Sequence, residues 1–151
     1  MTSKICTSVT QSVKLVEVGI AVDTADMYYC FDDNIGKHTE YAQVIPKSEL
    51  KPKEHFTLFP KDIPAWSLSA LIDMLPDTIE SGFWSLYTLY VCKTGVCYSA
   101  YYAESMQSLH RVGLYNGYFG ENPDIKDLVD ATFEMVVWLI GQKKDRMGGI
   151  N

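Results

Sequence analysis

The sequence predicts an α+β protein, with a small antiparallel sheet of two β-hairpins packed against a long C-terminal helix and one or two shorter helices. Two segments, 27–45 and 83–103, each hold a pair of β-favouring runs on either side of turn-forming residues. The third observation is an apolar repeat at helical spacing from Ile125 to Ile140. A chain of 151 residues is near the usual size of one domain, so we expect a single domain over residues 1–151.

The segment from Thr7 to Val18 is expected to form a short helix. Its valines recur at roughly helical spacing, Ser8 or Thr10 can serve as the N-cap, and Gly19 is typical of the residue after a helix. The segment is also rich in β-branched residues, so a strand over Val13 to Val22 is the alternative.

The first hairpin is predicted from Met27 to Phe31 and Glu40 to Ile45. These runs flank Asp32-Asp33-Asn34-Ile35-Gly36-Lys37, whose composition is that of a turn. From Pro46 to Pro64, four prolines and scattered lysines favour an extended surface connection over a regular element.

A short amphipathic helix is predicted between Ser67, its candidate N-cap, and Pro76, which closes it. Its apolar side chains recur at i, i+3, i+4 and i+7: Leu68, Leu71, Ile72 and Leu75.

The second hairpin is predicted from Phe83 to Cys92 and Val96 to Ala103. A two-residue loop at Thr94-Gly95 would place Cys92 opposite Cys97, close enough for a cross-strand disulfide. A type I turn over Lys93-Thr94 with Gly95 in the left-handed region is slightly favoured, because Thr accepts a positive φ poorly. That turn pairs Cys92 with Val96 and points the two thiols to opposite faces.

The segment from Glu104 to Glu121 has interleaved glycines and aromatics, which favours a mobile loop with a short helix over Ser105 to His110. Asn122-Pro123-Asp124 then signals the start of the C-terminal helix. Its second half, Met135 to Ile140, is apolar on all sides, so another element or a partner chain is expected to cover it.

Composition excludes several classes of protein. With a net charge of −6 and no dense Lys/Arg cluster, nucleic acid is not an expected partner. No apolar run is long enough for a membrane span or typical of a signal peptide, so we expect a cytoplasmic protein that does not engage a membrane. The four cysteines are then expected to be reduced thiols.

Motifs of catalysis and cofactor binding are mostly missing. His55-Phe56-Thr57 matches one half of a two-histidine phosphoesterase site, but a second His-x-Thr is absent, which favours a loop histidine. Cys92-x4-Cys97 lacks the tight paired spacing of structural zinc, and the aspartates between Asp23 and Asp33 lack a calcium-loop pattern, which leaves them turn and cap roles. We therefore predict no metal, no cofactor and no catalytic residue.

Binding is the better-supported expectation. The ten tyrosines form either a half-buried sheet surface, which strand propensity favours, or an aromatic recognition patch, and a site is expected first at His110-Arg111 beside the Tyr/Gly loop. The predicted binding residues are His110, Arg111, Tyr115, Tyr118 and Phe119. The predicted interface of a homodimer consists of Met135, Val137 and Trp138.

Four blocks of sequence resemble a family of small uncharacterised proteins encoded by gut-bacterial phages and related mobile elements. They span most of the chain in order, whereas Pro46 to Pro60 and Glu104 to Glu121 match nothing in that family. The blocks are Thr10-Gln11-Ser12 with Leu15 and Gly19-Ile20, Thr24 to Tyr29, Pro64 to Leu71 with Leu75-Pro76, and Asp130-Ala131 with Phe133-Glu134-Met135 and Trp138-Leu139.

The family has no established activity, so the resemblance implies only a phage or mobile-element accessory protein in a bacterial cytoplasm. Small proteins of that origin often bind a host factor or a host-made signal. The leading hypothesis is a non-catalytic binding module for a protein partner or small ligand. The alternative is a small hydrolase or phosphoesterase with His55 or His110 in acid/base work, and a third class is a virion or structural accessory.

Overall fold

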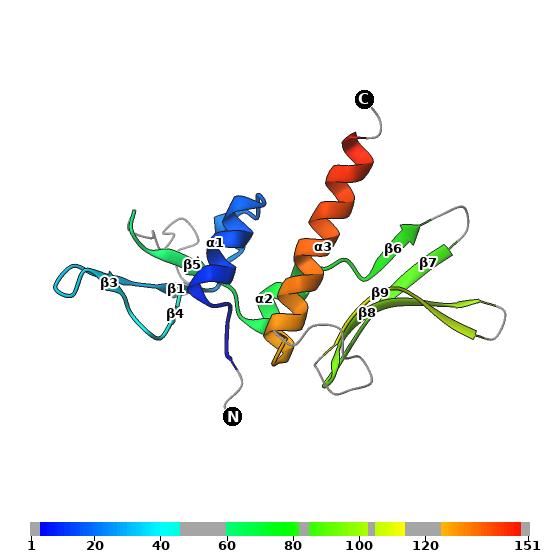
Figure 1. Ribbon diagram of the computed structural model, residues 1–151, viewed down its shortest axis with the longest axis horizontal. Helices are drawn as coiled ribbons and strands as arrows, with labels where there is room; N and C mark the ends of the chain where they lie inside the picture. The colour runs from blue at the N-terminus through cyan, green and yellow to red at the C-terminus, as the bar shows by residue number, and fades with distance from the viewer. Residues whose placement is uncertain (1–3, 46–59, 82–84, 103–104, 114–124, 149–151) are drawn as a thin grey trace, which may run out of the picture. The chain divides into compact units, whose positions relative to one another are not determined.

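A computed structural model describes residues 4–45, 60–81, 85–102, 105–113 and 125–148. Its mixture of helices and antiparallel sheets, with a helix at the C-terminus, confirms the α+β class (Figure 1). Contacts group the chain into two compact units: an N-terminal unit, Ile5–Ala70, and a C-terminal unit, Leu71–Asn151 together with Met1–Lys4. The single domain over 1–151 stays a prediction.

The N-terminal unit begins with helix α1 (Val9–Glu17), which confirms the predicted helix over the alternative strand. Ser8 is the N-cap: its hydroxyl accepts from the Gln11 amide, and the Gln11 side chain accepts from the Ser8 amide. The helix ends in a Schellman motif, in which the Ile20 amide donates to the Leu15 carbonyl across Gly19 at φ +98°. Local sequence at both ends therefore decides between helix and strand.

The first predicted hairpin is confirmed, and it consists of two successive pairs of short strands. β1 (Met27–Tyr29) pairs with β4 (Gln43–Val44), and nearer the turn β2 (Phe31–Asp32) pairs with β3 (Lys37–His38). A one-turn 3-10 helix, η1 (Val22–Thr24), precedes the hairpin.

Strand β5 (Ile63–Ala65) was not predicted, since the stretch up to Pro64 was expected to be an irregular connection. It pairs with β1 at the edge of the three-stranded sheet, where a proline without an amide hydrogen is tolerated. Residues 46–59 of the same stretch lie outside the described residues.

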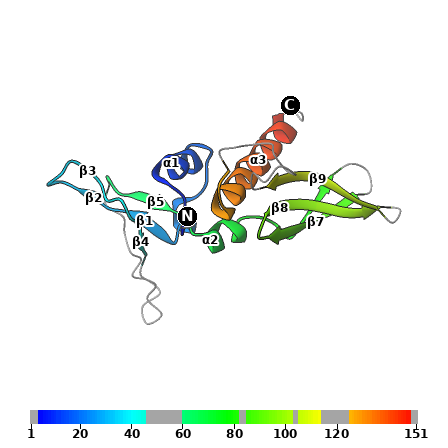
Figure 2. The same cartoon turned by 60° about the horizontal axis from the view of Figure 1, so that its bottom comes forward.

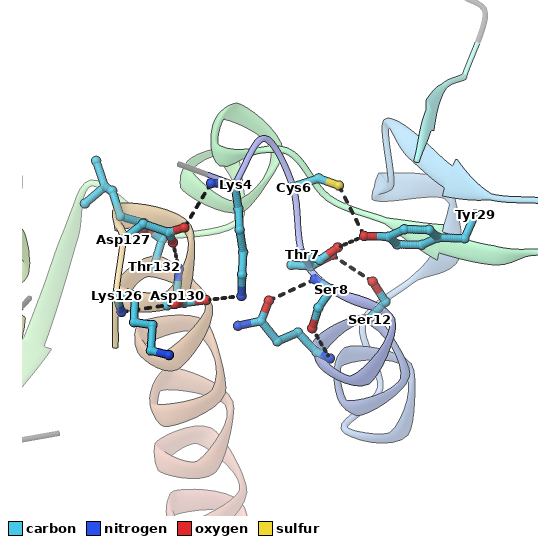
Figure 3. Close-up of polar contacts among 12 residues, drawn as sticks. Lys4, Cys6, Thr7, Ser8, Ser12, Tyr29, Lys126, Asp127, Asp130 and Thr132 are labelled. Atoms are coloured by element: carbon cyan, nitrogen blue, oxygen red, sulfur yellow. Dashed lines mark hydrogen bonds and ion pairs between the residues drawn. The ribbon is translucent and has the colours of Figure 1, made fainter. Parts of the chain in front are cut away.

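The core of the N-terminal unit forms around Tyr29. Cys6, Met27 and Ala65 are buried with it, and α1 packs against β5. The Tyr29 hydroxyl donates to the Thr7 carbonyl at 2.7 Å and lies 3.7 Å from the Cys6 sulfur (Figure 3). Burial, and then the contact with Cys6, raises the pKa of Tyr29 well above its ordinary value.

Helix α2 (Leu68–Asp73) confirms the second predicted helix and its cap. The Ser67 hydroxyl accepts from the Ala70 amide at 3.2 Å, and the Asp26 carboxylate in turn accepts from the Ser67 amide and hydroxyl. Asp32 has a local role, because its carboxylate accepts from the Asn34 amide in the hairpin turn. This contact confirms the turn role expected for Asp32, whereas Asp26 makes a long-range contact with the N-cap residue of α2.

The C-terminal unit holds a four-stranded antiparallel sheet in the order β6-β7-β8-β9. The predicted second hairpin is β7 (Ser85–Cys92) with β8 (Gly95–Tyr102), and β6 (Thr78–Ser81) is a strand that was not predicted. The predicted short helix over Ser105 to His110 is wrong, because β9 (Ser105–Gly113) pairs along the whole of β8. A register shift at Tyr98/Ser99 interrupts this pairing.

The turn between β7 and β8 differs from both predicted registers. Cys92 pairs with Gly95, so the loop is Lys93-Thr94, and the favoured pairing of Cys92 with Val96 is wrong by one residue. Gly95 is needed for a close approach of two backbones: a Cβ there would lie 2.3 Å from the Val112 carbonyl oxygen. This contact with β9, which the hairpin sequence alone does not reveal, sets the register.

Helix α3 (Leu128–Gly148) packs against β8 and β9 (Figure 2). It begins after Asp127, whose carboxylate accepts from the Asp130 amide, and so starts later than the Asn122-Pro123-Asp124 signal suggested. The N-terminal end of the chain is tied to this first turn, because the Lys4 ammonium lies 2.6 Å from the Asp130 carboxylate and the Lys4 amide donates to Asp127 (Figure 3). The predicted long C-terminal helix is thus confirmed with a different start.

Candidate functional site

The His110 and Trp138 side chains meet where α3 covers the four-stranded sheet. His110 is paired with Tyr98 across β8 and β9, and Tyr98 is fully buried, so both side chains lie on the face that α3 covers. The imidazole of His110 stacks parallel to the indole of Trp138, with 4.3 Å between ring centroids and 1° between ring planes. The stack holds the indole in one orientation between helix and sheet.

Two hollows lie beside this ring pair, and Trp138 lines both. The larger, of about 430 Å³, is called the Trp138 hollow here and is bounded by β6, β9 and α3. Its apolar walls come from Pro76, Ile79, Leu109, Trp138 and Leu139, and its polar lining comes from Thr78, Glu80, Gln142 and Lys143. The smaller, of about 340 Å³, lies toward the end of β9 and is lined by His110, Arg111, Val112, Gly113, Ile125, Glu134, Val137 and Trp138.

Tyr98 fixes one wall of the Trp138 hollow from within the core. Its hydroxyl donates to the carbonyl of Pro76, 2.7 Å away, at the point where the chain enters β6. Burial, and to a lesser extent the charge of Asp77, raises the pKa of Tyr98 to about 12. The hydroxyl therefore remains a neutral donor at ordinary pH, and Pro76 keeps its place.

The predicted neighbours His110 and Arg111 both line the smaller hollow, although their side chains leave β9 on opposite faces. Neighbouring residues of a strand point to opposite faces, and the Arg111 guanidinium donates to the Ser108 hydroxyl at 3.0 Å. Ser108 also bonds Ser99 across the strands, on the face away from α3. His110 thus lies on the covered face, whereas Arg111 contacts Ser108 on the other face and also lines the smaller hollow.

The remaining predicted binding residues, Tyr115, Tyr118 and Phe119, lie outside the described residues. Of the predicted interface residues, Met135 is fully buried within the chain, whereas Val137 and Trp138 are half-buried and line a hollow. Met135 therefore offers no side-chain area to a partner.

Sequence reasoning did not find Ile79, Leu109 or Gln142 as site residues. Nothing in the sequence marks Ile79, because β6 was not predicted, and Leu109 reaches the hollow from β9, which was expected to be helical. Only Trp138, singled out as an interface residue, carried a signal for this place.

A third hollow, of about 410 Å³, lies in the N-terminal unit beside the first hairpin and is lined by Cys30, Phe31, Asp33, Pro60, Lys61 and Asp62. The Lys61 ammonium lies 4.8 Å from the Phe31 ring centroid and 3.6 Å from the Asp33 carboxylate, and the Lys61 carbonyl lies 2.7 Å from His38 Nε2. These contacts hold the hairpin end against residues 60–62, and the exposed ions make it a weaker candidate for an apolar ligand.

Within the described ranges, no group of three or more His, Cys, Asp or Glu side chains is placed to hold a metal ion. His55, the histidine of the phosphoesterase-like motif, lies outside those ranges. Among the helices that the structure describes, none is both long and apolar enough to span a bilayer.

Comparison with known proteins adds no relative: no family model, no curated protein and no solved structure matches this chain.

Proposed function

We propose that this protein is a non-catalytic binding module that holds a small, ring-bearing ligand in the Trp138 hollow. The observation that carries the proposal is the hollow itself: about 430 Å³, with walls that are mainly apolar and a few polar groups at its edge. Sites for small molecules are typically concave, mostly apolar and roughly 300 to 1,000 Å³ in volume. A ligand of one or two rings fits this space.

A ring is favoured because the largest wall is an indole held in a fixed orientation. The parallel stack on His110 leaves Trp138 little freedom to rotate, so a ligand would not have to order it on binding. Aromatic rings gain roughly 0.5 to 1.5 kcal/mol from such neighbours beyond the area they bury. Gln142 and Lys143, adjacent residues of α3, supply hydrogen-bond donors at the edge of the hollow. These donors suit a ring that carries a polar or anionic substituent.

The opposite face of the sheet supports a protein partner less well. Leu86, Tyr90 and Met106 are exposed there, but exposed apolar side chains are ordinary on a protein surface. The homodimer, the cytoplasmic location, the phage or mobile-element origin and the histidine-dependent hydrolase stay predictions, and the binding proposal depends on none of them.

Native mass spectrometry of protein purified gently from a bacterial host tests the proposal. Wild type is expected to carry an added small-molecule mass. Gln142→Phe should lose this mass, because a phenyl ring on α3 would fill the hollow. Thr88→Phe is the matched control: it adds the same ring at an exposed position in β7, outside the residues that line the hollow, and should keep the added mass.

An added mass that survives in Gln142→Phe would place the ligand elsewhere and refute the proposed site. A bare chain in wild type, both before and after incubation with host metabolite extract, would refute the proposed function. The same spectra report the oligomer mass, which tests the predicted homodimer independently.

A further inference from the structure

Cys92 and Cys97 lie on the same face of the β7–β8 hairpin. Cys92 pairs with Gly95, and Cys97, two residues further along β8, pairs with Tyr90. Since side chains alternate faces with a period of two, the thiols occupy neighbouring rungs on one face. The register therefore brings together two cysteines that the favoured sequence prediction had separated.

The cross-strand partner of Cys92 has no side chain. Gly95 places no side chain opposite Cys92, whose thiol donates to the Gly95 carbonyl, so the nearest cross-strand side chain on that face is Cys97, on the diagonal. Diagonal neighbours in a sheet have Cα atoms roughly 7 to 8 Å apart, against about 4.4 to 6.8 Å in disulfides. A movement of about 1 Å at the end of the hairpin closes that difference.

The two thiols have complementary surroundings. Cys92 is exposed, and its sulfur lies 3.2 Å from the Thr94 hydroxyl, a contact that lowers the pKa of the thiol. Cys97 is half-buried and accepts a hydrogen bond from the Ser99 hydroxyl at 3.5 Å. Cys92 is thus suited to meet an oxidant from solvent, and Cys97 to react second.

The other two cysteines are not placed for this chemistry. Cys6 is buried against the Tyr29 hydroxyl, and Cys30 donates to the Phe31 carbonyl in a different part of the chain.

We propose that Cys92 and Cys97 form a redox-active dithiol that hydroperoxides convert to an intramolecular disulfide. The Cys92 thiolate attacks the peroxide, the O–O bond breaks, and Cys92 becomes a sulfenic acid while an alcohol or water leaves. The Cys97 sulfur then attacks the sulfenic sulfur, the S–O bond breaks, and water leaves as the S–S bond forms. With hydrogen peroxide, two thiols and one peroxide give one disulfide and two waters.

The modification site is independent of the proposed ligand. The disulfide would tie together the two strands next to the Lys93-Thr94 loop, on the sheet face away from the Trp138 hollow. A dithiol is regenerated by exchange with an added dithiol reductant.

Trypsin mapping after brief exposure to hydrogen peroxide tests the proposal. Cleavage after Lys93 separates the cysteines onto peptides 62–93 and 94–111, which stay joined only through the disulfide. The joined peptides are expected from wild type and from Cys30→Ser. In Cys97→Ser, Cys92 is expected to stop as a sulfenic acid that a dimedone probe labels.

The proposal requires that the folded hairpin makes the disulfide form faster than the short sequence separation of the two cysteines does by itself. We expect the joined peptides to form about tenfold faster in the folded protein than in concentrated urea, because the sheet orients the two sulfurs. An equal or slower rate in the folded protein would overturn the proposal. So would oxidation of Cys92 in wild type that leaves Cys97 a free thiol.

Discussion

Replacing Tyr98 by Phe should change how stability depends on pH. The Tyr98 ring is fully buried, and its hydroxyl donates to the Pro76 carbonyl at 2.7 Å. Burial of the phenolate, and to a lesser extent the charge of Asp77, raises the pKa of Tyr98 from 10.0 to about 12 in the folded protein. Phe keeps the ring and removes both the hydrogen bond and the titration.

The expected size follows from the two pKa values. The unfolded chain releases the proton near pH 10 and the folded chain near pH 12, so this contribution to stability is complete below pH 10 and is lost as the pH rises from 10 to 12. At about pH 11 the wild type loses roughly 1.4 kcal/mol of unfolding free energy through Tyr98 alone. Near pH 8, Tyr98→Phe should be less stable than wild type by about 1 kcal/mol, the usual net value of one hydrogen bond.

Urea unfolding of both proteins, with reductant present, measures the effect. The deficit of Tyr98→Phe is expected to fall from about 1 kcal/mol near pH 8 to about −0.4 kcal/mol near pH 11, where the variant becomes slightly more stable than wild type, because only wild type loses the Tyr98 contribution. Tyr90→Phe, on the exposed face of the same sheet, is the control and should follow wild type at both values. A Tyr98→Phe deficit that stays constant or grows with pH would refute the account of this buried hydroxyl.

Three further substitutions test the local structure, each by thermal or urea unfolding. Gly95→Ala should destabilise by about 2 kcal/mol, because its Cβ would lie 2.3 Å from a carbonyl oxygen of β9; an unchanged stability would contradict the tight approach. Ser8→Ala should cost about 1 kcal/mol by removing the cap of α1, and a cost near zero would argue against the capping box. Lys4→Ala should cost about 1 to 3 kcal/mol, because it leaves the Asp130 carboxylate, 7% exposed, without its ammonium, whereas Lys37→Ala on the surface should cost little.

Elements whose ends are set by neighbouring residues were predictable. Ser8 with Gln11 begins α1 and Gly19 ends it, so the helix was recognisable despite its valines. Ser67 begins α2 in the same way. At these helix ends, hydrogen bonds between residues a few positions apart determine the structure, so donor and acceptor can both be recognised in the local sequence.

Elements that depend on distant pairing were not predictable. β9 includes Ser105 to His110, which was expected to form a short helix in a mobile loop, and it is extended because β8 supplies its hydrogen-bond partners. The register of Cys92 follows from the contact between Gly95 and β9, which does not appear in the hairpin sequence itself.

The candidate site was predicted in part. The sequence pointed to His110 and, separately, to Trp138, but nothing in it showed that the two rings stack. Because side chains alternate along β9, those of His110 and Arg111 leave the strand on opposite faces. The sequence did not show this, since residues 105–110 were expected to be helical.

The most direct test of the binding proposal is an NMR titration with a set of ring-bearing small molecules, followed on the indole N–H signals. Trp66 is an internal reference, since it is fully buried in the N-terminal unit and donates its indole N–H to Thr24. The account predicts binders that shift the Trp138 signal, leave that of Trp66 unchanged and lose affinity in Gln142→Phe. Binders that act on Trp66 or on the Leu86 face without shifting Trp138, or a set in which nothing binds, would contradict it.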